Sequence, residues 1–373
     1  MRTLRYHVDR RAAEQPGAAY LIAPESGAVM TYLKLQQASC RLAAFLRARG
    51  LAKGDKVAFF LHNGYQAARL FIGIMYGGYT AAPLNLLSQR SQLAYVLEHS
   101  DARLVFTSAE HEPRVREALA DRRDVEVVVI DPDATEVLDD EALPVDALPA
   151  VREDDDALLM YTSGTTGVPK GVLHTHRSVT AGGEYTSAAH RLINTDRVLC
   201  ALPLYHINGQ IVTAVAPLVH GGSVVMPHRF SVTGYWHLAA EHRCTWINVV
   251  PTIIAYLLDA PDPRSSGLDL TRVKFCRSAS APLAPELHRA FEDRFGISII
   301  ETFGMTETNA PCFTNPYARE ERRIGSPGRA FGNEAKVIDP VTGAQVSHGV
   351  PGEIMVRGDN VMKCYYKDPE NTA

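Results

Sequence analysis

A glycine-rich stretch of the sequence, YTSGTTGVPKG at Tyr161–Gly171, combines residue types that can hold a phosphate group. Glycine tolerates backbone conformations in which successive N–H groups point inward around an anion. Four hydroxyl side chains add donors, and Lys170 adds a mobile positive charge. We expect this stretch to connect the strand ALLMYT to a helix that begins with HRSVTAGGEY, and to bind a polyphosphate. A flexible surface loop is the alternative, because clusters of Gly, Ser and Thr usually form loops.

The stretch differs from two common nucleotide-binding patterns. The pattern GxxxxGK[ST] is absent, because Val168 and Pro169 separate Gly167 from Lys170 and a glycine occupies the Ser/Thr position. The dinucleotide fingerprint GxGxxG does not appear in the sequence either. A kinase-type or GTPase-type phosphotransferase stays open as an alternative, and release of ADP rather than AMP would support it.

A second block, ETFGMTET at Glu301–Thr308, follows a predicted strand and could bind the rest of a nucleotide. Phe303 offers a flat face for a base, Thr306 a hydroxyl for a phosphate oxygen, and Glu307 a hard oxygen ligand for Mg²⁺. Phe303 as a core residue and Glu307 as a surface carboxylate are the alternatives.

Two further blocks carry candidate binding residues. SASAPL at Ser278–Leu283 has small side chains that let a flat base approach the backbone, and otherwise it resembles a helix start with a proline. LPLYHINGQ at Leu202–Gln210 contains His206 and Asn208, and Asn248 follows in WINVVPT. A lone histidine is usually a structural residue, and each asparagine is about as often structural as functional, so these blocks need support from the others.

Together these blocks resemble the adenylate-forming enzymes, the superfamily of acyl-CoA synthetases, luciferases and nonribosomal adenylation domains. YTSGTTGVPKGV resembles the signature loop of that superfamily, and the likeness covers nearly the whole chain in order. The closest similarity is to the large N-terminal domain of acyl-CoA synthetases. Phe303 departs from the usual tyrosine, which keeps the stacking face and loses a hydroxyl contact.

The resemblance implies a role for each block. Catalytic roles fall on Lys170, Thr306, Glu307 and His206, and Glu307 binds the metal. The cofactor, ATP with AMP as product, is implied to bind to Thr162, Ser163, Gly164, Thr165, Thr166, Gly167, Ser278, Ala279, Ser280, Ala281, Glu301, Thr302, Phe303, Gly304 and Met305. The carboxylic acid is implied to bind near His206, Asn208, Asn248 and Gly304.

The implied reaction is ATP-dependent activation of a carboxylic acid to an acyl-adenylate, with Mg²⁺, followed by thioester formation with coenzyme A. Leu202–Gln210 contains no acidic residue to pair with an ammonium group, so an α-amino acid is disfavoured. The apolar and aromatic residues around this block favour an aromatic or aliphatic acid as the substrate. A carrier-protein thiol as acceptor, a half-reaction member that only transfers the acyl group, and a structural module without a ligand stay open.

Short apolar, β-branched runs alternate with helical patterns, which predicts an α/β fold with mostly parallel sheets. Two amphipathic segments, SQRSQLAYVLEHS with Ser88 as N-cap and APELHRAFEDRFG ending at Gly296, are predicted helices. The strands are predicted at 56–62, 102–107, 125–130, 197–203, 222–227, 245–250, 272–278 and 297–303.

Residues 131–156 form an acidic segment that contains several prolines, and after about Gly325 short alternating runs lie between Pro/Gly turns. These two changes suggest three parts within residues 1–373. We expect two αβα units packed together, at 1–155 and 156–324, and a small antiparallel β-barrel at 325–373. The resemblance also implies a small C-terminal domain, with a ribose-binding aspartate and a second lysine, that lies outside these residues. We therefore expect residues 1–373 alone to bind an acyl-adenylate weakly and to turn over little.

Composition excludes several classes of protein. The chain has 373 residues, 46% of them hydrophobic, and a net charge of −4, with no basic run of the kind that binds nucleic acid. No apolar run approaches the roughly 20 residues that span a bilayer, and no signal peptide is evident. The six scattered cysteines suggest reduced thiols in a cytoplasmic protein without a disulfide framework or zinc site. A homodimer stays open.

Overall fold

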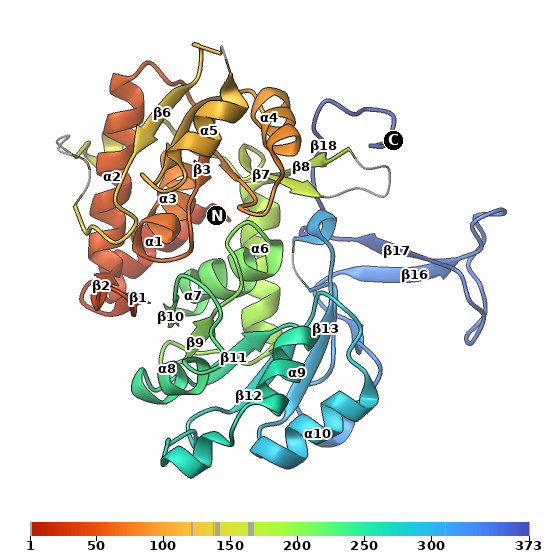
Figure 1. Ribbon diagram of the computed structural model, residues 1–373. Helices are drawn as coiled ribbons and strands as arrows, with labels where there is room; N and C mark the ends of the chain where they lie inside the picture. The colour runs from red at the N-terminus through yellow and green to blue at the C-terminus, as the bar shows by residue number, and fades with distance from the viewer. Residues whose placement is uncertain are drawn as a thin grey trace.

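The computed structural model describes residues 2–120, 122–136, 138, 142–162, 168–309 and 311–372. The described strands form two large sheets and one separate hairpin, and helices pack between and around the sheets (Figure 1). This arrangement confirms the α/β fold with mostly parallel sheets that the strand and helix patterns predict.

The first large sheet has seven strands, of which the five from β7 to β6 run parallel. β8 and β18 add to one edge as antiparallel strands. In order across the sheet, the strands are β18 (Cys364–Tyr365), β8 (Lys170–Thr175), β7 (Asp156–Thr162), β4 (Thr80–Pro83), β3 (Lys56–Phe60), β5 (Ala102–Thr107) and β6 (Glu126–Val129).

The second large sheet has nine strands, with a parallel centre, one antiparallel pairing at the β2 edge and two at the β15 edge. In order, the strands are β15 (Arg329–Ala330), β14 (Phe313–Thr314), β13 (Ile299–Phe303), β12 (Phe275–Ser278), β11 (Trp246–Val249), β9 (Arg197–Cys200), β10 (Ser223–Val225), β1 (Ala19–Ala23) and β2 (Ala28–Thr31).

No helix of the described chain is long and apolar enough to cross a membrane. The α-helices are α1 (Leu4–Glu14), α2 (Tyr32–Ala48), α3 (Tyr65–Tyr76), α4 (Arg90–His99), α5 (Glu112–Leu119), α6 (His176–Ala189), α7 (Ala216–His220), α8 (Tyr235–Glu241), α9 (Pro251–Asp259) and α10 (Pro285–Phe295). A π-helix, η2 (Asn208–Val215), precedes α7, and short 3-10 turns are η1 (Val145–Ala147), η3 (Pro263–Ser266), η4 (Thr306–Thr308) and η5 (Arg319–Glu321).

Strand β3 shows why the predicted strands are almost continuously apolar. Val57 and Phe59 join the large core that runs between the two sheets, whereas Ala58 and Phe60 join a second cluster under α4 and α5. Successive side chains of a strand point to opposite faces, so a strand covered on both faces needs apolar residues at every position.

All eight predicted strands and both predicted helices are present, with small shifts at their ends. α10 ends at Gly296, whose φ of 68° is the left-handed conformation that glycine favours after a helix. α4 begins one residue later than predicted, with Gln89 rather than Ser88 as its N-cap.

The sheets do not follow the division of the chain at residue 155. β1 and β2, near the N-terminus, belong to the nine-stranded sheet, and β7 and β8 belong to the seven-stranded sheet. This exchange has a physical basis, because β1 pairs with β10 at Leu21–Val224 and Ile22–Val225, far along the chain. Local sequence patterns do not encode such pairings.

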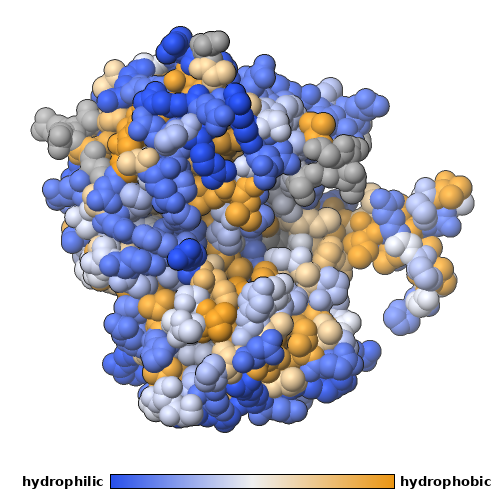
Figure 2. Space-filling view, in the orientation of Figure 1, coloured by the Kyte–Doolittle hydropathy of each residue, from blue (hydrophilic) through white to orange (hydrophobic). Residues whose placement is uncertain are grey.

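The segment from 325 to 373 is antiparallel, as expected, but its described strands do not close into a barrel. β16 (Glu334–Ile338) and β17 (Glu353–Arg357) form a hairpin that projects from the body of the molecule (Figure 1). The other strands of this segment, β15 and β18, add to the edges of the two large sheets instead. Apolar side chains of β17, Ile354 and Met355, are exposed on this hairpin, which is partly orange in Figure 2.

The cysteines are unpaired, as predicted. Five of the six are buried and Cys364 is half-buried, so they contribute to the core as small apolar residues.

Candidate active site

The predicted phosphate loop connects two antiparallel strands, β7 and β8. Thr162 at the end of β7 pairs with Lys170 at the start of β8, so both ends of the loop lie side by side. This pairing fixes the position of Lys170 relative to the loop. The predicted loop residues Ser163, Gly164, Thr165, Thr166 and Gly167 lie outside the described residues.

The prediction that the loop leads directly into a helix is wrong. Residues 170–175 form β8, and its register pairs Val172 with Met160 of β7. The predicted helix follows this strand: α6 begins at His176, the first residue of HRSVTAGGEY, where Thr175 and Ser178 form a capping box through bonds of 3.2 and 3.1 Å. In the described chain, the nearby positive charge for a phosphate therefore comes from Lys170 rather than from a helix N-terminus.

Lys170 and Glu307 both contact the side chain of Tyr365, Lys170 at the ring and Glu307 at the hydroxyl. The Lys170 Nζ atom lies 5.2 Å from the centre of the Tyr365 ring, within the range of a cation–π contact. The Tyr365 hydroxyl donates a hydrogen bond of 2.8 Å to Glu307 Oε1. Burial and the neighbouring Glu307 carboxylate raise the pKa of Tyr365 to about 12, so this hydroxyl keeps its proton at neutral pH. Lys170 also donates a 3.0 Å hydrogen bond to Asn371, in an exposed position.

The short turn η4 carries Thr306 and Glu307, and three distant groups hold its backbone. His174 Nε2 lies 2.8 Å from the Thr306 carbonyl, Asn360 Nδ2 donates to the Thr308 carbonyl at 2.8 Å, and Met362 N donates to the Glu307 carbonyl at 2.7 Å. His174 is fully buried, and desolvation lowers its pKa to about 4. Because a carbonyl only accepts, neutral His174 carries its proton on Nε2.

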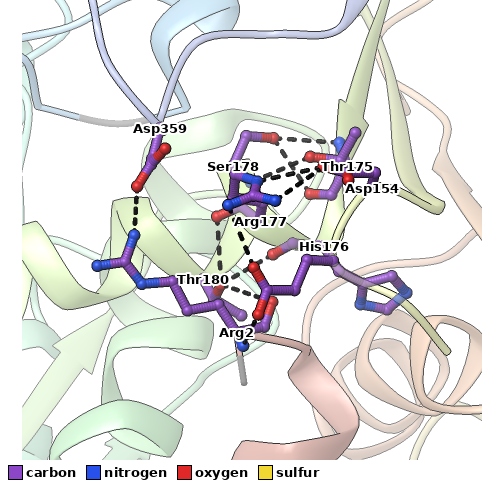
Figure 3. A network of polar contacts seen from close by, with 9 residues as sticks. Arg2, Asp154, Thr175, His176, Arg177, Ser178, Thr180 and Asp359 are labelled. Carbon is purple, nitrogen blue, oxygen red and sulfur yellow. Dashed lines mark hydrogen bonds and ion pairs between the residues drawn. The ribbon is translucent and has the colours of Figure 1, made fainter.

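A polar network at the start of α6 fixes the chain that leads into β18 (Figure 3). Arg2 pairs with Asp359 and with Glu184 of α6, and its backbone N–H donates to Glu153 at 2.8 Å. Arg177 pairs with Asp154 just before β7. These contacts join the N-terminus, the strand before the loop and the segment before Tyr365, so they position the Lys170–Tyr365–Glu307 group from outside.

The residues predicted to hold the base lie at the carboxyl ends of two neighbouring parallel strands. Ser278 ends β12 and is paired in register with Glu301 of β13, while Phe303 ends β13. Phe303 is half-buried and lies edge to face against Phe313, with ring centres 6.0 Å apart. Gly304 and two residues of the small-residue block, Ala279 and Ser280, line one small cavity. The structure thus brings together the two blocks that were expected to hold the base.

Other predicted binding residues of these blocks have mainly structural positions. Glu301 and Thr302 are buried, Glu301 Oε1 accepts a 3.4 Å bond from Leu283 N, and desolvation raises the Glu301 pKa. Ala281 and Met305 are exposed. These side chains shape the loops beside the cavity.

Of the predicted acyl-pocket residues, Asn208 and Gly304 line the same cavity, Asn248 is hydrogen-bonded to Asn208, and His206 does not line it. Asn248 Nδ2 donates to Asn208 Oδ1 at 3.0 Å, and Asn208 Nδ2 donates to Ser280 Oγ at 3.1 Å. His206 is exposed and adjoins Tyr205, with ring centres 4.8 Å apart, and the surrounding protein still lowers its pKa by desolvation. Tyr205 and Thr162 line another cavity of about 70 Å³, which places this block beside the start of the phosphate loop.

Three residues at the site were not predicted from the sequence: Tyr365, His174 and Arg277. Tyr365 acts through strand pairing and His174 through a side-chain hydrogen bond, each to a segment far away in sequence, which no local pattern indicates. Arg277 had a visible signal, because it is a charged residue inside the predicted strand RVKFCRS. Its Nη1 atom donates to Asn208 Oδ1 at 2.7 Å and to Asn248 Oδ1 at 2.9 Å.

The site combines a lysine with an exposed ammonium group, a carboxylate and a possible base platform at strand ends. This combination fits the class of proteins that bind nucleotides. The sequence model of the family described as "AMP-binding enzyme" matches residues 8–366. The chain belongs to the AMP-binding enzyme family.

Characterised relatives of the chain are CoA ligases by name. The chain is 52% identical over 368 residues to the sulfoacetate–CoA ligase of Cupriavidus necator, covering 97% of this chain and 71% of that protein. It is 33% identical over 387 residues to 4-coumarate–CoA ligase 3 of Oryza sativa, covering 99% of this chain and 69% of that protein.

Solved structures share the fold over the whole chain. ATP-bound MatB from Rhodopseudomonas palustris aligns with a TM-score of 0.88 at 28% identity, covering 99% of this chain and 73% of that one. The N-terminal domain of FACL13 from Mycobacterium tuberculosis aligns with a TM-score of 0.88 at 27% identity, covering 100% of this chain and 93% of that one.

The buried His174 predicts a measurable pH dependence of stability. Its pKa falls from 6.5 to about 4 in the folded chain, so between these values the unfolded chain binds a proton that the folded chain does not. The free energy of unfolding therefore decreases as pH falls through this range, by about 3 kcal/mol for this residue. In His174→Gln, which keeps an N–H donor for the Thr306 carbonyl, we expect a shallower decrease. Urea unfolding of both proteins between about pH 7.5 and 4.5 measures the difference. Parallel curves would contradict the prediction.

Proposed function

We propose that this chain binds ATP and a carboxylic acid and forms an acyl-adenylate, which the enzyme then converts to a coenzyme A thioester with release of AMP. The observation that carries this proposal is the meeting of Lys170, Tyr365 and Glu307 from three distant segments. The base platform of Phe303, Ala279 and Ser280 lies on strands adjoining the same turn. The family membership and the names of the relatives support the same reaction.

The first step requires the acid carboxylate to attack the α-phosphorus of ATP while pyrophosphate leaves. Both reactants are anions, so neutralising charge is the main demand on the site. Lys170 begins a strand at the loop and its ammonium group is exposed, so it can turn from Asn371 to a phosphate. Thr306 presents a hydroxyl next to Glu307 on a turn whose backbone is fixed from three sides. These residues orient the phosphates and balance their charge.

Glu307 is the residue that would hold Mg²⁺ in this reaction. Its carboxylate is half-buried and accepts a hydrogen bond from the neutral Tyr365 hydroxyl, and no cation among the described residues pairs with it. Magnesium commonly takes one or two carboxylates together with substrate phosphates, which fits this donor set. When bound, the ion would neutralise charge on the phosphate oxygens.

The acid is not an α-amino acid. Adenylation of an α-amino acid needs a carboxylate for the ammonium group, and the described residues around the cavity of Asn208 provide none. The relatives' names include a short sulfonated acid and an aromatic acid, sulfoacetate and 4-coumarate, and both belong in a substrate screen. A carrier-protein thiol and a member that only transfers a preformed acyl group are the alternatives, and ATP–pyrophosphate exchange separates the latter from an adenylating enzyme.

Replacement of Lys170 by Met tests the phosphate-binding role. We expect acid-dependent ATP–pyrophosphate exchange by the full-length enzyme, screened first with sulfoacetate and 4-coumarate, to fall roughly 100-fold or more, because a preorganised charge is lost from the transition state. The matched control is Lys363→Met, which removes a surface ion pair of 2.6 Å with Asp156 on the neighbouring strand and should change the rate less than about twofold. Equal rates for Lys170→Met and the wild type would overturn the role.

Replacement of Glu307 by Gln tests the metal-binding role. The amide keeps the size of the side chain and an oxygen acceptor for Tyr365, but loses the charge that attracts a divalent ion. We expect the Mg²⁺ concentration for half-maximal exchange to rise by about tenfold or more. A loss of activity at every Mg²⁺ concentration, with an unchanged midpoint, would show that Glu307 does not act through the metal.

A further inference from the structure

We propose that Arg277 binds a second anionic group on the acid, so that the chain activates short carboxylic acids that carry two negative charges. This inference rests on the proposed function, because it takes the cavity at Asn208 and Gly304 as the acyl end of the adenylate site. To that function the inference adds the chemical class of the acid and the residue that selects this acid.

Arg277 is a buried cation without an anionic partner. Its side chain is 2% exposed, and among the described residues no carboxylate forms an ion pair with it. Its Nη1 atom donates to the neutral amide oxygens of Asn208 and Asn248, and its Nε atom has no hydrogen-bond partner. Burial lowers the Arg277 pKa to about 9, so the guanidinium stays charged at neutral pH. A buried charge is unfavourable unless it is paired, which leaves this one suited to an anion from outside.

The sheet register shows that the neighbouring carboxylate cannot serve as this partner. Ser278 is paired with Glu301, so these two side chains share one face of the sheet. Arg277 therefore points to the opposite face, together with its paired neighbour Asn248 on β11. On that face η2 supplies Asn208, and the arginine lines the cavity with Ala279, Ser280 and Gly304. The cation thus lies beside the predicted base platform.

The size of the cavity restricts the acid. Its volume is about 20 Å³, comparable to the room that one water molecule needs. A carboxylate or sulfonate one or two carbons from the reacting carboxyl group needs little more room, whereas an aromatic ring or a long chain needs a much larger pocket.

The expectation of an aromatic or aliphatic acid came from apolar residues that serve the core instead. Ile211 and Val215 of η2 are buried in the large core between the sheets, and of the residues in QIVTAVAPLV only Val212 lines this cavity. The lining of this cavity also includes the apolar residues Ile207, Ala279 and Pro311, and Arg277 is the charged group in it that a substrate can meet.

The test uses two stable mimics of an acyl-adenylate, a sulfamoyl adenosine acylated with malonate and the same compound acylated with malonamate. In the second mimic a neutral amide replaces the outer carboxylate, and the nucleotide is unchanged. Isothermal titration calorimetry on the full-length enzyme should show the malonyl compound binding roughly 30-fold or more tightly, since the loss of one partner of a buried charge pair has an effect of this size. Equal affinities, or tighter binding of the amide, would overturn the inference while leaving the proposed function standing. Binding of neither compound would overturn the proposed function, and the inference with it.

Two variants separate substrate recognition from a structural role of Arg277. Arg277→Gln removes the charge but keeps an N–H donor for the asparagines, and it should bind the two mimics with similar affinity. Arg277→Lys keeps the charge and should retain a preference for the malonyl compound. Weaker binding of both mimics by the same factor in Arg277→Gln would indicate a structural role and overturn the inference. The affinity ratio of the wild type decides the question if a variant fails to fold.

Discussion

The antiparallel pairing of β18 with β8 is the interaction on which the site depends. It places Cys364 opposite Leu173 and Tyr365 opposite Val172, close to Lys170 at the start of β8. Tyr365 can then contact Lys170 with its ring and Glu307 with its hydroxyl. Without this two-residue strand, the lysine and the carboxylate would have no common neighbour among the described residues. The ion pair between Arg2 and Asp359 and the hydrogen bonds of Asn360 and Met362 support the same stretch of chain.

The site contains two cationic side chains with opposite environments. Lys170 is solvent-accessible and has a flexible stem, which suits phosphates that arrive, react and leave. Arg277 is buried and held by two asparagine oxygens, which suits a fixed group whose position decides which acid reacts. Between them lie η4 and the ends of β12 and β13, where the chemistry is proposed to occur. In this proposal, the two cations have separate roles, one in binding phosphates and one in selecting the acid.

The sequence predicts the helices and strands of this fold better than it predicts which of them pair or contact one another. Alternating apolar runs indicate the parallel strands, and the Pro285 and Gly296 signals mark both ends of α10. Lys170 and Glu307 can be selected from their motifs because their chemistry depends on residue type. Tyr365 and His174 matter through contacts across more than a hundred residues of chain, which composition and periodicity do not contain. The assignment of β1 and β2 to the second sheet is long-range in the same way.

A crystal structure of the chain with a sulfamoyl mimic of an acyl-adenylate tests the central claim most directly, namely that these segments surround one nucleotide. The account predicts the adenine against Phe303 and the Ala279–Ser280 backbone, the sulfamoyl group within hydrogen-bonding distance of Thr306, and the acyl group directed towards Arg277. Adenine bound elsewhere on the molecule, or bound here with its acyl group pointing away from Arg277 and Asn208, would contradict it.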